Sequence, residues 1–315
     1  MDSFFMFLAF IGTIVISTSF VYSKLVLTQI KNPIHMLFLQ IAINYILLLI
    51  PYFPSLLLFG SEMNENLTIN NIFIIFCSAM VIFAGLITFF IGLNEGNVST
   101  GGVVVSSRII FSVILAWMFL NERFPFDSYL FILVVFIGVL MVSWQEELKL
   151  KEIFFFKSSG SGWFILAVIF FAIGNAFIRL LSNQINILTQ LVFRLAFLLI
   201  ATLVSYPLLN RKIGDQRSLK ETVTKPKLVL QAIIYVVLIM IADIATTLAL
   251  GESLTITEAI AALQGLFIFI LLVIISQNKT LKNALQEPFD KKTLTVRFLG
   301  VIIATIGIFS FIYGL

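Results

Sequence analysis

The segment LNEGNVSTGGVVV (residues 93–105) and the segment LGESLTITEAIAA (residues 250–262) align without a gap at a shift of 157 residues. A second pair, INYILLLIPY (43–52) and FLLIATLVSY (197–206), aligns at the similar shift of 154 residues. Each match is weak by itself. Because both occur in the same order and at nearly the same shift, together they predict that the chain contains a duplicated unit.

The composition is that of an integral membrane protein. Of the 315 residues, 60% are hydrophobic and 11% are charged, whereas an average soluble domain is about 25% charged. The chain has one cysteine, Cys77, and one histidine, His35. It therefore cannot form an internal disulfide bond, and it has too few ligands for a Cys/His metal site. The net charge of +4 is small, and the basic loops also carry Asp and Glu, so no nucleic-acid partner is expected.

Ten apolar segments are long enough to cross a bilayer as helices, which takes about 20 residues each. Polar residues separate them, and Pro51 and Pro54 predict a kink or an early end in the second segment. The fold class predicted is an all-α integral membrane protein with ten transmembrane helices. The expected spans are 3–23, 34–58, 70–93, 97–120, 128–145, 161–182, 187–209, 228–250, 254–276 and 296–314.

The number of spans in each repeat has a topological consequence. A first repeat of five spans, 1–146, ends on the opposite side of the membrane from its start. The second repeat, 161–315, must therefore insert upside down, with 147–160 as a cytoplasmic linker. Two inverted five-helix repeats are typical of secondary transporters, which move one repeat against the other around a site near the bilayer midplane.

The distribution of basic residues predicts the orientation. The loops that follow the first, third, fifth, seventh and ninth spans hold 16 of the 20 Lys and Arg residues. By the positive-inside rule these loops are cytoplasmic, so both termini are expected on the extracytoplasmic side. The expected location is the plasma membrane, specifically a bacterial inner membrane, as a multi-pass protein.

Several short motifs resemble a known group of carriers. The stretch FLNERFPFDSYLFILVVFIGVLMV (119–142) is similar to the Leu-Gly-Glu-Arg loop and glycine-bearing last helix that close each half of EamA-type transporters. RFLGVIIATIGIF (297–309) is a second copy of that helix, and SFVYSKL (19–25) is similar to the polar end of the first helix of that family. Arg194 matches an arginine common in the seventh helix. With its ten spans, the chain resembles the drug/metabolite transporter superfamily over nearly its full length.

The resemblance implies a central cavity lined by helices 1, 3, 4, 6, 8 and 9, with helices 2 and 7 further out. Ionisable residues inside spans are rare, because insertion at the bilayer centre costs about 2.5–3.5 kcal/mol each. On the implied cavity helices they are Arg108, Arg179, Asp243 and Glu258. Arg194, on the seventh helix, is predicted to be structural.

Arg108 has two interpretations, which are compatible. It shares a helix face with small and polar residues, so it can clamp a substrate carboxylate or phosphate, or form an internal ion pair with Asp243. Asp243 is a candidate for proton coupling or for binding a substrate ammonium group, and otherwise serves as a structural counter-ion.

The remaining candidates are polar residues near the ends of helices. Asn175 and Arg179 lie on one stripe of the sixth span, which either lines a vestibule or faces the headgroups. Glu258 and Gln264 either line the cavity or stabilise their own helix, through its dipole and through an interhelical hydrogen bond. The substrate-binding residues predicted are Arg108, Asp243, Asn175, Arg179, Glu258 and Gln264.

The leading hypothesis is a secondary transporter for a small polar or amphipathic metabolite, amino-acid-like and with an anionic group, driven by a proton gradient or by exchange. The motif GxxxxGK[ST] does not occur, so direct use of ATP is not expected, and neither is a cofactor. The alternatives are a membrane-embedded acyl or glycosyl transferase and, third, a channel or scaffold. The expected partners are the substrate and the lipid bilayer, and a homodimer is an open alternative.

Overall fold

A computed structural model describes residues 2–64, 67–123, 125–142, 160–213, 219, 224–278, 285 and 291–313. Every secondary-structure element in these ranges is helical. The first half of the chain contains α1 (Ser3–Ile30), α2 (Pro33–Asn64), α3 (Ile69–Glu95), α4 (Val98–Ser106), α5 (Arg108–Phe119) and α6 (Phe126–Val142). The second half contains α8 (Ser161–Leu181), α9 (Ile187–Lys212), α11 (Pro226–Leu250), α12 (Leu254–Ala261), α13 (Gln264–Ser276) and α15 (Lys291–Tyr313).

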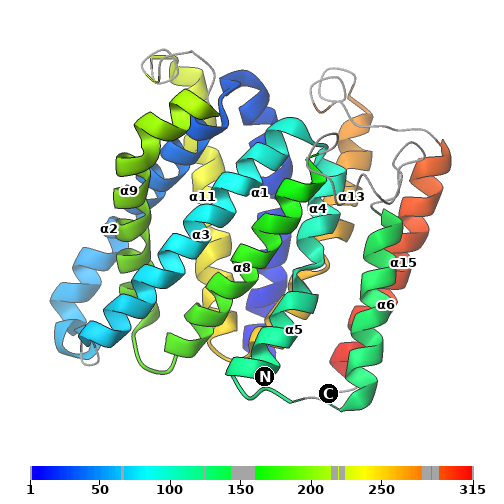
Figure 1. The fold of residues 1–315 in the computed structure, drawn as a ribbon, viewed down its shortest axis with the longest axis horizontal. Coiled ribbons are helices and arrows are strands. Elements are labelled where there is room, and N and C mark those ends of the chain that lie inside the picture. The colour runs from blue at the N-terminus through cyan, green and yellow to red at the C-terminus, as the bar shows by residue number, and fades with distance from the viewer. Residues whose placement is uncertain are drawn as a thin grey trace.

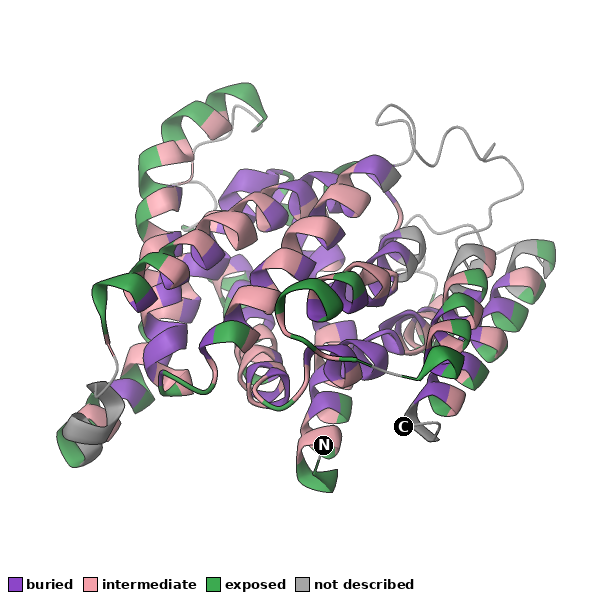
Figure 2. Ribbon diagram, turned by 60° about the horizontal axis from the view of Figure 1, so that its bottom comes forward, coloured by how far each residue is buried: buried purple, intermediate pink, exposed green. Residues whose placement is uncertain are grey.

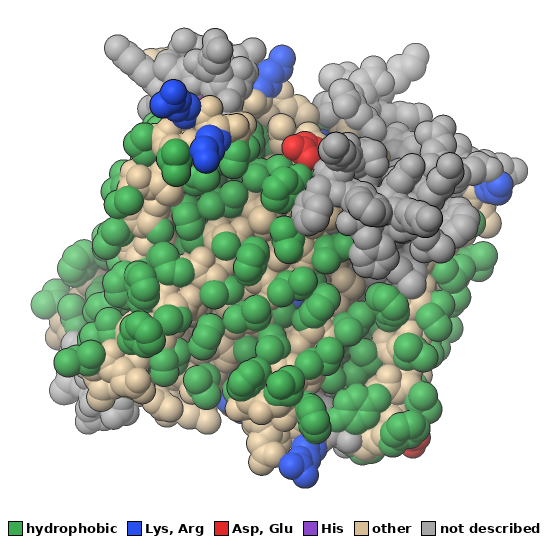
Figure 3. Space-filling view, viewed as in Figure 1, with side chains coloured by type: hydrophobic (Ala, Val, Ile, Leu, Met, Phe, Trp, Pro, Cys, Tyr) green, Lys and Arg blue, Asp and Glu red, His purple; other side chains and the backbone are tan. Residues whose placement is uncertain are grey.

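The helices confirm the prediction of an all-α membrane protein. Within the described residues, seven helices are long and apolar enough to cross a membrane, and shorter apolar helices lie at Val104–Phe119, Phe126–Gly138 and Thr295–Phe311. Hydrophobic side chains cover the side of the bundle, while Lys and Arg appear at its two ends (Figure 3). Buried residues are concentrated where helices face one another (Figure 2). An apolar outer surface of this kind suits lipid, which cannot hydrogen-bond to polar groups.

The helices begin where the sequence offers caps. The Asp2 side chain accepts from the Phe4 amide, Thr68 from the Asn71 amide, and Asn186 from the Leu188 amide. Helix α2 continues through Pro51 and Pro54, so the expected alternative of an early end is wrong. The Ser55 hydroxyl donates to the Pro51 carbonyl at 2.9 Å, which gives that acceptor a partner inside the helix.

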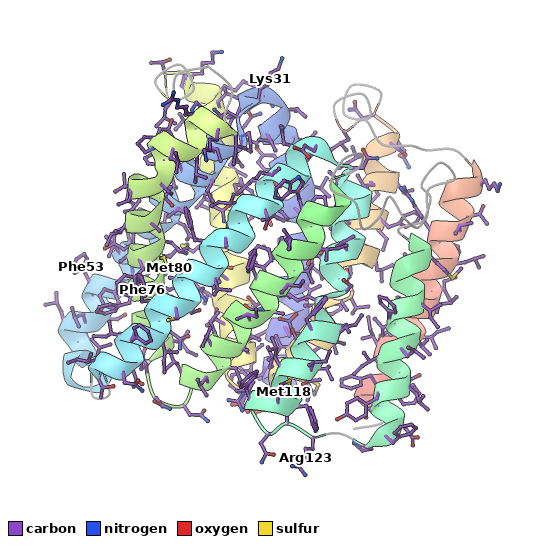
Figure 4. The ribbon with its side chains drawn as sticks, in the orientation of Figure 1. Lys31, Phe53, Phe76, Met80, Met118 and Arg123 are labelled. Carbon is purple, nitrogen blue, oxygen red and sulfur yellow. The ribbon has the colours of Figure 1, made fainter. Side chains whose placement is uncertain are left out.

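The two halves run in opposite directions. Both chain ends lie at the same end of the bundle (Figure 1), and Lys31 and Arg123 lie at opposite ends (Figure 4). Helix α1 therefore rises from the end with the termini, whereas α8, the first helix of the second half, descends toward it (Figure 1). The predicted linker 147–160 falls outside the described residues except for Gly160.

Two transmembrane helices are interrupted at matching places. Ser107 separates α4 from α5, and Ala262 and Leu263 separate α12 from α13. At the predicted shift of 157 residues, Ser107 corresponds to Gln264, the residue directly after the second interruption. The Ser106 hydroxyl accepts from the Gly265 amide at 2.8 Å, across the two halves. Irregular backbone at membrane depth is tolerated where such partners or a cavity receive its polar groups.

Helices α6 and α15 form a closely packed antiparallel pair at one side of the bundle (Figure 1). A Cβ atom at Gly138 would collide with the backbone of Gly300 and Ala304, and one at Gly307 would meet the backbone of α6. The glycines that carried the family resemblance therefore allow the two backbones to approach each other.

Candidate functional site

A cavity of about 150 Å³ lies between the two halves, near the middle of the bundle. Helix α1 contributes Thr13, Ser19 and Phe20 from its central turns, and the other walls come from α2, α3, α4 and α5 of the first half. The second half contributes side chains from α8, α9, α11, α12 and α13. Both halves of the chain therefore contribute to its walls.

On one wall, Arg108 is ion-paired with Glu258. The Arg108 Nε lies 2.6 Å from Glu258 Oε2, and the Asn175 amide donates to Glu258 Oε1 at 2.6 Å. The Glu258 side chain is 1% exposed and that of Arg108 is 13% exposed. The pair joins α5 of the first half to α12 of the second. The expectation that Arg108 pairs with Asp243 is wrong, because Glu258, and not Asp243, lies within ion-pair distance of the guanidinium.

On the opposite wall, α2, α9 and α11 bring together Gln40, Asn44, Arg194, Tyr235 and Asp243. The Tyr235 hydroxyl donates to Gln40 Oε1 at 2.8 Å, and Asn44 and Asp243 line the same wall. Arg194 and Asp243 attract each other electrostatically without forming an ion pair within 4.0 Å. Arg194 is buried and Asp243 is half-buried.

These positions correct two expectations taken from the family resemblance. Helices α2 and α9, the second and seventh spans, line the cavity rather than lying further out. Arg194 accordingly faces the cavity, whereas the sequence predicted a structural residue away from it. Gln40 and Asn44 were missed, although their spacing of four residues in an apolar helix places two amides on one face and is a usable signal. Tyr235 has no comparable signal in the sequence.

The other predicted site residues divide into two groups. Asn175, Glu258 and Gln264 line the cavity, as expected. Arg179 is not among the lining residues: its guanidinium donates to the Gly251 carbonyl and the Ser182 hydroxyl, and lies 3.5 Å from Glu122. The structure thus brings together five of the six predicted residues and places Arg179 nearer the end with the termini.

Glu122 joins the two halves at that end of the bundle. Its carboxylate accepts from the amides of Leu254 and Thr255, at 3.0 and 3.1 Å, and from the Thr255 hydroxyl at 2.8 Å. Because these groups form the first turn of α12, a carboxylate from the first half caps a helix of the second half. At the other end, Lys24 of α1 donates to the carbonyls of Leu93 and Gly96, at 2.6 and 2.9 Å, where α3 ends.

Metal binding has little support in the described ranges, where no three His, Cys, Asp or Glu side chains lie close enough together to hold an ion. The cavity offers instead two cations, two carboxylates, several amide and hydroxyl groups, and apolar surface between them. This arrangement suits reversible binding of a small polar molecule.

Comparison with known proteins agrees with this architecture. Residues 3–144 match the EamA-like transporter family. A solved structure, described only as a "crystal structure of protein", is similar at 11% identity with a TM-score of 0.58, and the similarity covers 94% of this chain and 95% of that one. At that identity the likeness concerns the fold alone. No curated protein matches the chain.

Proposed function

Residues 3–144 place this multi-pass membrane protein in the drug/metabolite transporter superfamily, and from that premise we propose that it is a secondary transporter of a small polar metabolite. EamA family members are generally transporters rather than enzymes. The observation that carries the proposal is the central cavity, which is lined by both halves and holds buried charges. Charges inside a membrane protein are costly and usually mark a substrate or ion pathway.

The size and charge of the cavity support a particular class of substrate. Its volume of about 150 Å³ is below the range of about 300–1,000 Å³ typical for drug-sized ligands. The substrate is therefore amino-acid-like in size. Arg194, buried in the cavity wall, favours a substrate with an anionic group, and the polar and apolar lining favours an amphipathic one.

We propose that transport occurs by alternating access of two inverted repeats, 1–146 and 161–315. The bonds of Glu122 to Leu254 and Thr255 hold the halves together at the end with the termini. Opening the cavity to that side requires these bonds to break. Because the chain carries no nucleotide-binding motif, a proton gradient or exchange drives the cycle, and Asp243 is the candidate proton site.

The orientation follows from charge. The basic loops lie on the cytoplasmic side of a bacterial inner membrane, and both termini lie outside. A fluorescent protein that folds only in the cytoplasm, fused after Leu315, is expected to stay dark, while an alkaline phosphatase fusion at the same site is expected to be active. The reverse result would overturn this orientation.

Counterflow in proteoliposomes tests the proposed activity. Vesicles containing the purified full chain are loaded with an unlabelled amino acid or carboxylic acid and diluted into a trace of the labelled compound. A transporter accumulates label transiently, because unlabelled substrate leaves in exchange. Protein-free vesicles are the control, and vesicles with Arg123→Gln, a change in an exposed loop, are expected to match the wild type. If no compound of a broad metabolite panel exchanges faster than in protein-free vesicles, the proposal is wrong.

A further inference from the structure

We propose that Arg194, and not Arg108, is the residue that binds the anionic group of the substrate, and that this group is a carboxylate. The inference rests on the transport function proposed above and assigns a specific residue within the same cavity. The supporting observation is a difference between the two arginines. Glu258 already neutralises Arg108, whereas no carboxylate of the described residues lies within ion-pair distance of Arg194.

Arg194 is buried in the cavity wall and has no direct partner among the described residues. The residue is 6% exposed. No hydrogen bond, and no ion pair within 4.0 Å, joins its guanidinium to any residue that the structure describes. A guanidinium has five N–H donors and stays charged in proteins. A buried guanidinium needs hydrogen-bond acceptors, and at Arg194 a ligand or water in the cavity must supply them.

Arg108, in contrast, is already neutralised. Its Nε contacts Glu258 at 2.6 Å, and the second oxygen of that carboxylate accepts from Asn175. A substrate anion at Arg108 would have to displace a carboxylate that is 1% exposed and leave it without its cation. Breaking a buried pair in this way is strongly unfavourable. Arg108 therefore connects the halves, and the anion site lies elsewhere.

The surroundings of Arg194 leave room for a ligand. Asp243 is its electrostatic partner, but the two groups are too far apart for an ion pair. A ligand carboxylate can reach the guanidinium fork with two parallel hydrogen bonds, which is the geometry arginine favours. Asp243 and Asn44, on the same wall, can accept hydrogen bonds from a donor group on the ligand.

The duplication supports a specific role for this cation. In the alignment of the halves, Arg194 corresponds to Gln40, which is neutral and accepts from the Tyr235 hydroxyl. The repeated scaffold therefore forms without a charge at this position. The charge occurs in one half only, where it faces the cavity.

Ligand-induced thermal stabilisation of the purified full chain tests the inference, because the shift in melting temperature reports ligand binding whether or not the protein transports the ligand. The probes are leucine, pyruvate and succinate, each paired with its amide, together with inorganic phosphate. At least one carboxylate is expected to raise the melting temperature of the wild type, while its amide does not. Arg194→Gln is expected to weaken that binding roughly 10- to 100-fold, the range for a lost charge-assisted hydrogen-bonded pair.

The control is the double variant Arg108→Gln, Glu258→Gln, which removes the other cation together with its partner and is expected to lose less carboxylate binding than Arg194→Gln. Arg123→Gln, in an exposed loop, is the neutral reference. If Arg194→Gln does not fold, Arg194→Lys is tested instead. It is expected to weaken carboxylate binding about tenfold, because lysine keeps the charge but lacks the planar guanidinium that binds a carboxylate with two hydrogen bonds. Unchanged binding in the Arg194 variants, loss confined to the control, stabilisation by phosphate alone, or no stabilisation of the wild type would each overturn the inference. Carboxylate binding without counterflow would instead refute the transport function alone.

Discussion

The ion pair between Arg108 and Glu258 makes a quantitative prediction, because little of either side chain is exposed. Glu258→Leu removes the carboxylate, and so leaves the Arg108 guanidinium, 13% exposed, without its anionic partner. Arg108→Met leaves the Glu258 carboxylate, 1% exposed, with only the Asn175 amide as a partner. Breaking one side of a buried pair typically costs about 3–5 kcal/mol of folding free energy.

The double variant Arg108→Met, Glu258→Leu separates the free energy of the ion pair from the effect of each substitution on packing. Replacing both partners of a buried ion pair with apolar groups is often close to neutral. We therefore expect the double variant to be no less stable than either single variant, which gives a coupling energy of about 3 kcal/mol or more in the double-mutant cycle.

The assay is reversible unfolding of the detergent-solubilised protein by sodium dodecyl sulfate, followed by tryptophan fluorescence. Arg123→Met serves as the matched control, because Arg123 lies exposed at the end of the bundle (Figure 4), and a change there is expected to stay within about 0.5 kcal/mol of the wild type. If the two single losses simply add in the double variant, the pair has no coupling and the reasoning fails.

Three further predictions use the same unfolding assay. Glu122→Gln removes the charge from the cap of α12 and is expected to cost about 1 kcal/mol; no loss would mean that the capping bonds contribute nothing. Ser106→Ala leaves the buried Gly265 amide without its acceptor and is expected to cost about 1–3 kcal/mol, whereas Ser276→Ala, at an exposed hydroxyl, is the neutral control. Gly138→Leu forces α6 away from α15 and is expected to cost at least about 1–3 kcal/mol; wild-type stability would contradict the close backbone approach.

Most of the fold is predictable from the sequence, for a physical reason. Lipid demands long apolar helices, so hydropathy alone identifies the seven long apolar helices and the three shorter ones among the described residues. The interruptions at Ser107 and at Ala262 are different, because hydropathy predicts each of these spans as one continuous helix. They depend on which groups face them across the bundle, such as the Ser106 hydroxyl opposite the Gly265 amide.

The site was harder to predict because it depends on register between helices distant in sequence. Asp243 and Glu258 both lie in the second half, and hydropathy does not distinguish which of them faces Arg108. The position of Arg194 was mispredicted for a related reason: the general arrangement of the family placed its helix outside the cavity, whereas α9 lines it here. Arg179 was predicted to bind substrate, but it pairs with Glu122 across the two halves.

The hydrogen bond from Gly265 to Ser106 has a consequence for how the protein is made. The ribosome delivers the first half to the membrane before the second, so Ser106 and Glu122 are in place when α12 and α13 arrive. The second half receives both its cap and the acceptor for its interrupted helix from a part of the chain that is already inserted. Biogenesis therefore has a direction: the first half acts as the template on which the second is completed, and the second half produced without it lacks both partners.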